Sequence, residues 1–177
     1  PTEEQAPGMT SGYKEAIEQY RTSLAPHVRV LFDRYRLCDV AAKVVGVGSV
    51  GTFCAIALMM DAEEGALFLQ VKEARASVLE PYAGKSAYAN NGQRVVEGQR
   101  LMQAASDIFL GWARGENGKE MYMRQLRDAK ISALIETFDE DVLRKYGQLC
   151  GWALARAHAR SGDSAMIAGY MGSGEVF

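Results

Sequence analysis

The stretch KVVGVGSVGTFCAIALMMDAEEGALFLQVKEA (43–74) decides the fold of this chain. It contains a glycine-rich turn, GVGSVG (46–51), then the apolar segment TFCAIALMM (52–60), an acidic turn, and the segment ALFLQVKEA (66–74). β-Branched and aromatic residues in the apolar segments favour strands, and the glycine and acidic residues mark turns. The pattern therefore predicts two successive strands, over about 51–60 and 66–74, that follow a glycine turn.

The flanking sequence extends this pattern to a mostly antiparallel sheet of about five strands. Valines before the glycine turn predict a strand over 38–47, and apolar segments on both sides of RGENGK (114–119) predict strands over 108–113 and 119–126. Together with the helices expected around it, this sheet places the chain in the α+β class.

Helices are predicted on both sides of the sheet segments. Apolar residues recur at helical spacing between 11 and 35, where Pro26 starts a second helix, and again over 93–106. The longest predicted helix runs from Asp139, a side chain suited to cap it, to about residue 160 before Gly162. We therefore expect three parts: N-terminal helices at 1–36, a sheet domain at 37–128 and a C-terminal helical segment at 129–177.

Composition sets limits on function. The 177 residues carry 20 Lys and Arg against 22 Asp and Glu, a net charge of −2, and 48% are hydrophobic. This balance excludes a strongly basic nucleic-acid-binding protein and fits a globular domain with its own core. The three cysteines are far apart, and no apolar run reaches the roughly 20 residues that cross a bilayer. We expect a cytoplasmic protein without nucleic-acid or membrane partners.

The glycine turn matches G-x-G-x-x-G, which three kinds of phosphate site could use, because glycines let backbone N–H groups approach a phosphate. A Walker P-loop is excluded since Thr52 stands where its lysine belongs. A dinucleotide-binding fold would use Glu73 for the ribose, but it requires a helix over 52–60 and alternating strands and helices.

A kinase-type glycine hairpin fits the order of elements best. That arrangement needs a glycine turn between two strands, a lysine on the third strand, and a glutamate on the next helix. Lys72 ends the strand LFLQVK, 21 residues after Gly51, and Glu97 lies on the helix that follows. We expect Gly46, Gly48, Ser49 and Gly51 to hold phosphates through backbone N–H groups. Lys72, paired with Glu97, would contact phosphate oxygens.

The same hypothesis assigns the segment after the last strand. The segment Gln125–Asp128, with Gln125 and Leu126 as its site residues, would form the adenine-side hinge of a site for ATP with Mg²⁺. A non-enzymatic scaffold or regulatory module, in which the glycine turn is purely structural, and the dinucleotide-binding domain remain as alternatives.

Longer strings show a family resemblance. KVVGVGSVGT (43–52), GQRVVEGQRLMQAASDIFLGW (92–112) and LCGWALARAHARSGD (149–163) closely resemble an uncharacterised bacterial group, domain-of-unknown-function family 2252. The resemblance covers about residues 30–172. It implies a longer protein whose other part carries a Gly-Asp-x-His-x-x-Asn string and an Asp-rich string, similar to motifs of aminoglycoside-phosphotransferase-like kinases.

This chain lacks those motifs. Gly162-Asp163 is followed by Ser-Ala without an asparagine in register, and Thr137-Phe138-Asp139 precedes a helix. No catalytic base or metal-binding carboxylate can be assigned. We expect a piece of a longer protein, also because Met9 is preceded by other residues, and we expect this chain to be inert alone. Its partners would be a nucleotide and the missing N-terminal part of the same protein.

Overall fold

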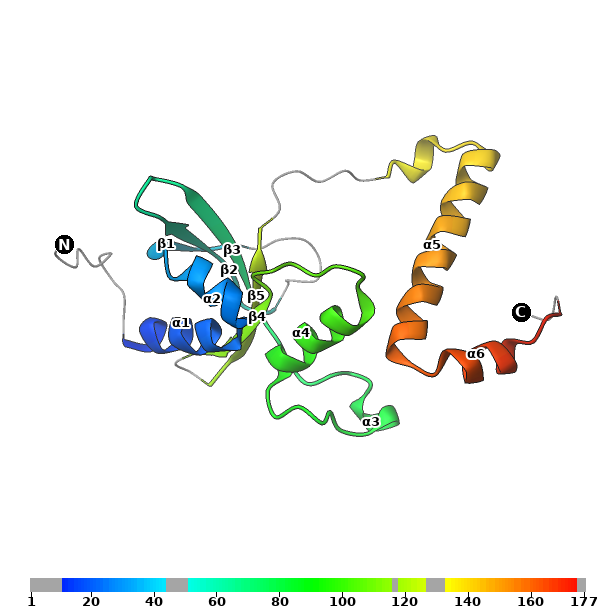
Figure 1. Cartoon of the computed structure of the whole chain (residues 1–177), viewed down its shortest axis with the longest axis horizontal. Coiled ribbons are helices and arrows are strands. Elements are labelled where there is room, and N and C mark those ends of the chain that lie inside the picture. The colour runs from blue at the N-terminus through cyan, green and yellow to red at the C-terminus, as the bar shows by residue number, and fades with distance from the viewer. Residues whose placement is uncertain (1–10, 44–50, 116–117, 127–132, 175–177) are drawn as a thin grey trace. The chain divides into compact units, whose positions relative to one another are not determined.

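The computed structural model describes residues 11–43, 51–115, 118–126 and 133–174. They belong to two compact units, Pro1–Glu97 with Ser106–Arg127 and Gly98–Ala105 with Asp128–Phe177. The predicted α+β class is confirmed: the first unit contains one five-stranded sheet, and helices occur in both units. Figure 1 shows these elements along the chain.

The sheet has the order β1-β2-β3-β5-β4, and every neighbouring pair is antiparallel. Its strands are β1 (Arg36–Ala42), β2 (Cys54–Met60), β3 (Ala66–Glu73), β4 (Gly111–Arg114) and β5 (Glu120–Gln125). The prediction that β4 covers 108–113 is wrong at its start. The Asp107 carboxylate accepts a hydrogen bond from the Phe109 N–H at 2.9 Å and so stabilises a turn there.

The antiparallel pairing of β1 with β2 overturns the dinucleotide-binding alternative. That fold needs a helix directly after the glycine turn, and the structure has the strand β2 at this place, paired with β1 through Val40 and Ala57. All strand pairs among the described residues are antiparallel, whereas the dinucleotide fold requires a parallel sheet. The β-branched and aromatic content of 52–60 decided the outcome.

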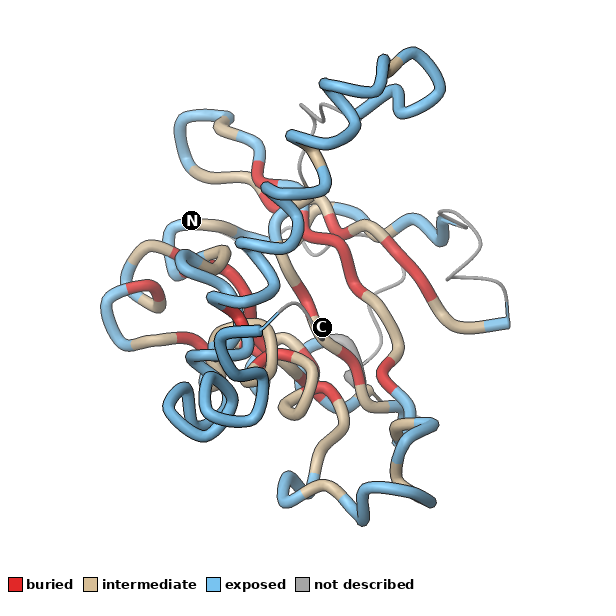
Figure 2. Tube along the Cα trace, turned by 90° about the vertical axis from the view of Figure 1, so that its right-hand side faces the viewer, coloured by how far each residue is buried: buried red, intermediate tan, exposed pale blue. Residues whose placement is uncertain are grey.

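Helices α1 (Ser11–Ser23) and α2 (Pro26–Phe32) cover one face of the sheet and form the main core with it. Tyr20 is 1% exposed, and its hydroxyl donates to the Phe109 carbonyl at 2.6 Å. Gly111 of β4 lets α1 approach closely, because a Cβ there would meet the Ser23 Oγ at 2.5 Å. Figure 2 shows that the buried residues gather on the strands.

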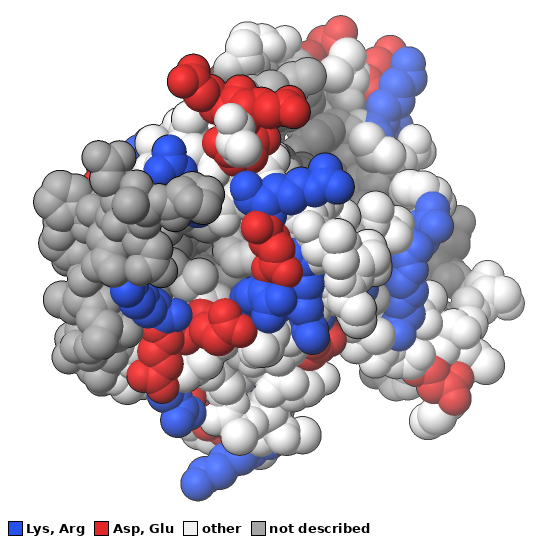
Figure 3. Space-filling model, turned by 60° about the vertical axis from the view of Figure 1, so that its left-hand side comes forward, with Lys and Arg blue, Asp and Glu red and all other residues white. Residues whose placement is uncertain are grey.

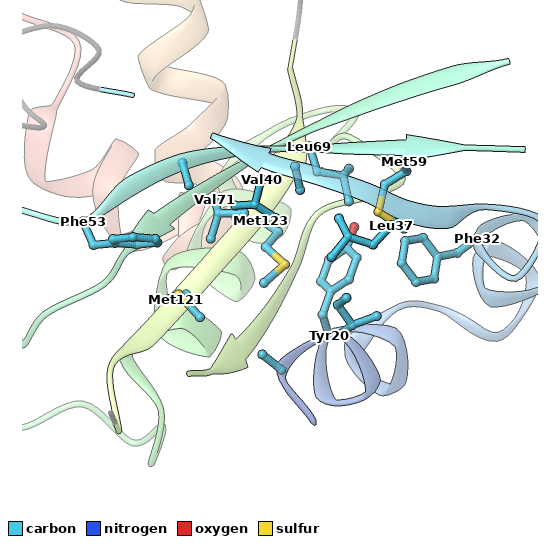
Figure 4. A pocket seen from close by; sticks show the side chains of 14 residues that line it. Tyr20, Phe32, Leu37, Val40, Phe53, Met59, Leu69, Val71, Met121 and Met123 are labelled. Carbon is cyan, nitrogen blue, oxygen red and sulfur yellow. The ribbon is translucent and has the colours of Figure 1, made fainter. Parts of the chain in front are cut away.

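A cavity of about 60 Å³ remains in this core, between α1, α2 and the sheet. Figure 4 shows its lining, which consists of aliphatic, aromatic and thioether side chains, among them Phe53, Met59 and Val71. A space with such walls offers nothing that would hold a polar ligand or an ordered water.

Helix α4 (Asn91–Met102) begins two residues before and ends four residues before the predicted 93–106. Asn90 caps it, since its side chain accepts a hydrogen bond from the Gln93 N–H, and the Glu120 carboxylate accepts from the Asn91 N–H at 2.8 Å. Gly92 lies directly against the Met121 carbonyl of β5. These contacts fix the start of α4 on the sheet. Between β3 and α4 lies the short helix α3 (Glu80–Ala83).

The second unit contains the short 3-10 helix η2 (Ile135–Thr137), α5 (Glu140–Ser161) and α6 (Ser164–Met171). The predicted cap of the long helix is confirmed, because the Asp139 side chain accepts from the Val142 N–H at 2.8 Å. Gly162 follows α5 as predicted, and α6, capped by Asp163, was not predicted.

Candidate functional site

The sheet face opposite the core carries the candidate site. Strand alternation and the pairing register place side chains of three strands on this face, which we call the polar face. They include Cys54, Ile56 and Leu58 of β2, Phe68, Gln70 and Lys72 of β3, and Glu120, Tyr122 and Arg124 of β5.

Lys72 lies near the end of the central strand β3, opposite Cys54 on one side and Tyr122 on the other. It is half-buried and makes no ion pair or hydrogen bond with any described residue. In Figure 3, by contrast, basic and acidic side chains lie next to one another near the middle of the view, and Arg21 and Arg114 both pair with carboxylates. A half-buried ammonium without a partner is a favourable position for a bound anion, because the anion offsets the cost of burying the charge.

The end of the glycine turn is fixed at the same end of the β2–β3 pair as this lysine. Gly51 has φ +74°, a conformation that favours glycine, and its carbonyl accepts a hydrogen bond from Arg75 Nη2 at 2.6 Å. Arg75 is held in turn by Glu73, whose other carboxylate oxygen accepts from the Phe53 N–H at 2.8 Å. Glu73 therefore has a positioning role here, and not the ribose contact of a dinucleotide fold. The Arg75 guanidinium and the Phe53 N–H hold the pKa of Glu73 below its usual range.

Arg94 of α4 reaches the same end of β3. Its Nη2 donates to the Arg75 carbonyl at 2.8 Å. Its Nε–H is buried and has no acceptor within the described structure. A buried donor without an acceptor is costly, so this N–H adds to the demand for an acceptor or anion at this end of β3.

A second cation occupies the polar face beside Lys72. Gln70 is 2% exposed, and its Oε1 accepts hydrogen bonds from both Nε and Nη2 of Arg124, each at 3.1 Å. As with Lys72, the described residues provide no carboxylate partner for Arg124. Burial raises the pKa of the neighbouring Tyr122, and the Arg124 cation opposes this shift. The two cations of this face are donors, and its carboxylate, Glu120, already accepts from Arg114 and Asn91.

The polar face also carries an accessible group of apolar side chains. Phe68 is 45% exposed, and Ile56 and Leu58 beside it are half-buried. The register pairs Leu58 with Phe68 and Ile56 with Gln70. An apolar platform thus lies beside the two cations, on the far side of Gln70 from Lys72.

The predicted site residues are only partly brought together. Gly46, Gly48 and Ser49 lie outside the described residues, whereas Gly51 and Lys72 lie at the same end of the β2–β3 pair.

Glu97 is half-buried on α4 after the fully buried Val96, and it has an interaction of its own. Lys72 forms no ion pair within the described part of the chain, so the structure does not show it paired with Glu97. The pairing stays a prediction.

The backbone N–H groups of the predicted hinge residues Gln125 and Leu126 are already hydrogen-bonded within the protein. The Leu126 N–H donates to the Phe68 carbonyl at 2.8 Å, and the Gln125 N–H donates to the Asp107 carboxylate. Both N–H groups therefore already have acceptors in the protein. The adenine-side role of Gln125 and Leu126 stays a prediction that can rest only on their other groups.

Sequence reasoning missed Gln70, and it considered Glu73 only as the ribose contact of a dinucleotide fold. Gln70 in the otherwise apolar strand LFLQV was the available signal, because a polar residue inside a buried strand needs a partner. Among the described residues, no three His, Cys, Asp or Glu side chains are grouped to hold a metal ion. In the same part of the chain, every helix is too short or too polar to cross a membrane.

The fold and site define an α+β protein with two cations on one sheet face and with Gly51, the end of the glycine turn, held at the same end of the β2–β3 pair as Lys72. The profile of a family described as "Uncharacterized protein conserved in bacteria (DUF2252)" matches residues 6–177. The chain belongs to this family. Comparison with curated proteins gave no match, and comparison with solved structures gave none either.

Proposed function

We propose that the polar face binds a nucleotide with its phosphates at Lys72, as the nucleotide-side half of a kinase-like phosphotransferase fold. The observation that carries the proposal is the half-buried Lys72 ammonium, without a carboxylate partner in the described structure and at the same end of the β2–β3 pair as Gly51, the fixed end of the glycine turn. The order of elements supports it. A glycine turn, a lysine strand, a helix and a two-stranded hairpin follow one another as in kinases.

Each part of the face has a role in this proposal. Lys72 would contact phosphate oxygens as a point charge, and the backbone N–H groups of the glycine turn would add donors. The base would lie on the platform of Ile56, Leu58 and Phe68. Mg²⁺ would come with the phosphates of ATP. The catalytic base and the metal-binding carboxylates of a complete enzyme would be supplied from outside this chain.

Calorimetric titration with ATP and Mg²⁺ tests the proposal. Lys72→Ala should weaken binding about ten-fold, which corresponds to about 1.4 kcal/mol. The matched control is Lys145→Ala, which removes an exposed lysine from α5 and should leave the affinity unchanged. Equal affinities of wild type and Lys72→Ala would contradict the proposal.

A phosphoryl-transfer assay addresses activity separately. We expect no turnover by this chain alone, and turnover would show that it contains catalytic groups not recognised in its sequence. If neither ATP nor another nucleotide binds, the alternative of a non-enzymatic scaffold or regulatory module is favoured.

A further inference from the structure

We propose that Arg124, held by Gln70, reads the base of the nucleotide and selects guanine over adenine. The inference rests on the proposed function, which places phosphates at Lys72, and it refines the choice of nucleotide. It is carried by the position of Arg124 on the polar face and by the donors that its hydrogen bonds leave free.

Arg124 lies on the base side of the site. Lys72 is opposite Cys54, only three residues from the end of the glycine turn, whereas Arg124 is opposite Gln70, two positions further from that turn. Diagonal neighbours of this kind have Cα atoms about 7–8 Å apart. A nucleotide with phosphates at Lys72 therefore extends its base towards Arg124 and the apolar platform.

Gln70 fixes the orientation of the guanidinium and uses up a nearby acceptor. The Gln70 Oε1 accepts from Nε and Nη2 of Arg124, both at 3.1 Å. An arginine has five N–H donors and no acceptor, so three donors remain, two of them on Nη1. They form a rigid fork that matches two adjacent acceptors.

The two purines differ in what they offer to such a fork. Guanine presents two neighbouring acceptors, O6 and N7, whereas adenine presents N7 beside the N6 amino group, which is a donor. The adenine amino group would face an arginine donor. No backbone N–H at Gln125 or Leu126 compensates for this, because both already donate within the protein. The donor set therefore favours a 6-oxopurine.

Competition calorimetry with Mg²⁺ and four nucleotides tests the inference. GTP and ITP, which share O6 and N7, should bind about ten-fold more tightly than ATP, and 7-deaza-GTP should lose most of this advantage. Arg124→Lys keeps the charge but removes the fork, so it should reduce the ratio of GTP to ATP affinity to near one. ATP binding as tight as GTP binding would overturn the inference.

Two further variants separate the possible causes. Gln70→Leu should lower the GTP preference while Arg124 is still present, since Gln70 is a positioning residue; an unchanged preference would contradict that role.

Inorganic triphosphate should bind wild type and Arg124→Lys equally. If Arg124→Lys weakens triphosphate as much as GTP, then Arg124 contacts phosphate and the inference is wrong. Lys72→Ala should weaken GTP and ATP by the same factor, so failure of the proposed function is recognised independently. Circular dichroism of each variant verifies folding.

Discussion

Glu73 connects the lysine strand to the end of the glycine turn through its two carboxylate oxygens. One accepts from Arg75 at 2.7 Å and the other from the Phe53 N–H at 2.8 Å. The Glu73 side chain is 10% exposed, whereas that of Arg75 is 60% exposed. The hydrogen bond to the backbone is therefore the better protected of the two, and Glu73 helps set the position of Gly51 relative to Lys72.

Glu73→Gln should lower the free energy of unfolding by about 1 kcal/mol at neutral pH. Because the folded-state pKa of Glu73 is lowered, its stabilisation is complete above the carboxyl's ordinary pKa of 4.5 and is lost as pH falls through the folded-state value. The difference between wild type and Glu73→Gln should thus shrink in acid. Urea denaturation at several pH values measures it.

Glu64→Gln is the matched control, since Glu64 is exposed in the turn between β2 and β3. It should leave the free energy of unfolding within about 0.5 kcal/mol of wild type. A Glu73→Gln effect that did not change with pH would contradict the role assigned to the carboxylate charge.

Contacts between residues close in the chain could be predicted from the sequence, whereas contacts between distant residues could not. The Asp139 cap was predictable because capping depends on residues three apart in the chain. The contact between Gln70 and Arg124 joins residues 54 apart and depends on the strand register. A register is set by the hydrophobic patterns of both strands together with the turn geometry, so neither segment alone shows which residues will face each other.

Helix α4 owes its place on the sheet to a glycine. A Cβ at Gly92 would overlap the Met121 carbonyl of β5, whereas a Cβ at Gly98 of the same helix meets no atom within 4 Å. Because helices prefer alanine to glycine by up to about 1 kcal/mol, the two positions should respond oppositely to the same substitution.

Gly92→Ala should destabilise the protein by about 2 kcal/mol or more, since the backbone of α4 or β5 must move. Gly98→Ala should be neutral or stabilise it. Thermal denaturation compares them. If both variants are equally stable, α4 is not packed on β5 as closely as the structure shows.

The elements themselves were largely predictable, and their ends were not. Strands β2 and β3 follow from their β-branched and aromatic residues, within three residues of the predicted bounds. Helix α4 begins earlier than predicted although Asn90 and Asn91 are typical of turns. The Asn90 side chain accepts a hydrogen bond from the Gln93 N–H, and Asn91 donates from its backbone and side chain to the Glu120 carboxylate. The bonds with Glu120 come from a segment 29 residues away, so local sequence gives no sign of them.

At the scale of the whole first unit, the core is imperfectly filled. Val71 is 7% exposed and lines the cavity of about 60 Å³ between the helices and the sheet. Val71→Ile adds one methylene group in a strand that suits a β-branched residue, and burial of that group is worth about 0.8 kcal/mol.

Val71→Ile should therefore raise the free energy of unfolding by about 0.5–1 kcal/mol in a urea titration. The control is Val30→Ile on α2, where the side chain is 64% exposed and a change of less than about 0.5 kcal/mol is expected. A loss of stability in Val71→Ile would mean that the cavity cannot accept the added group. The cavity was not predictable, because packing gaps depend on how distant helices and strands meet.

The hydrogen bond between Gln70 and Arg124 also bears on how the family can change over evolutionary time. Glutamine and glutamate codons differ at one base, so a single point mutation can turn this amide into a carboxylate. The carboxylate would neutralise Arg124 without disturbing the geometry of the strands. If the proposed function holds, a lineage with glutamate at this position should keep the fold and bind nucleotide more weakly than one with glutamine.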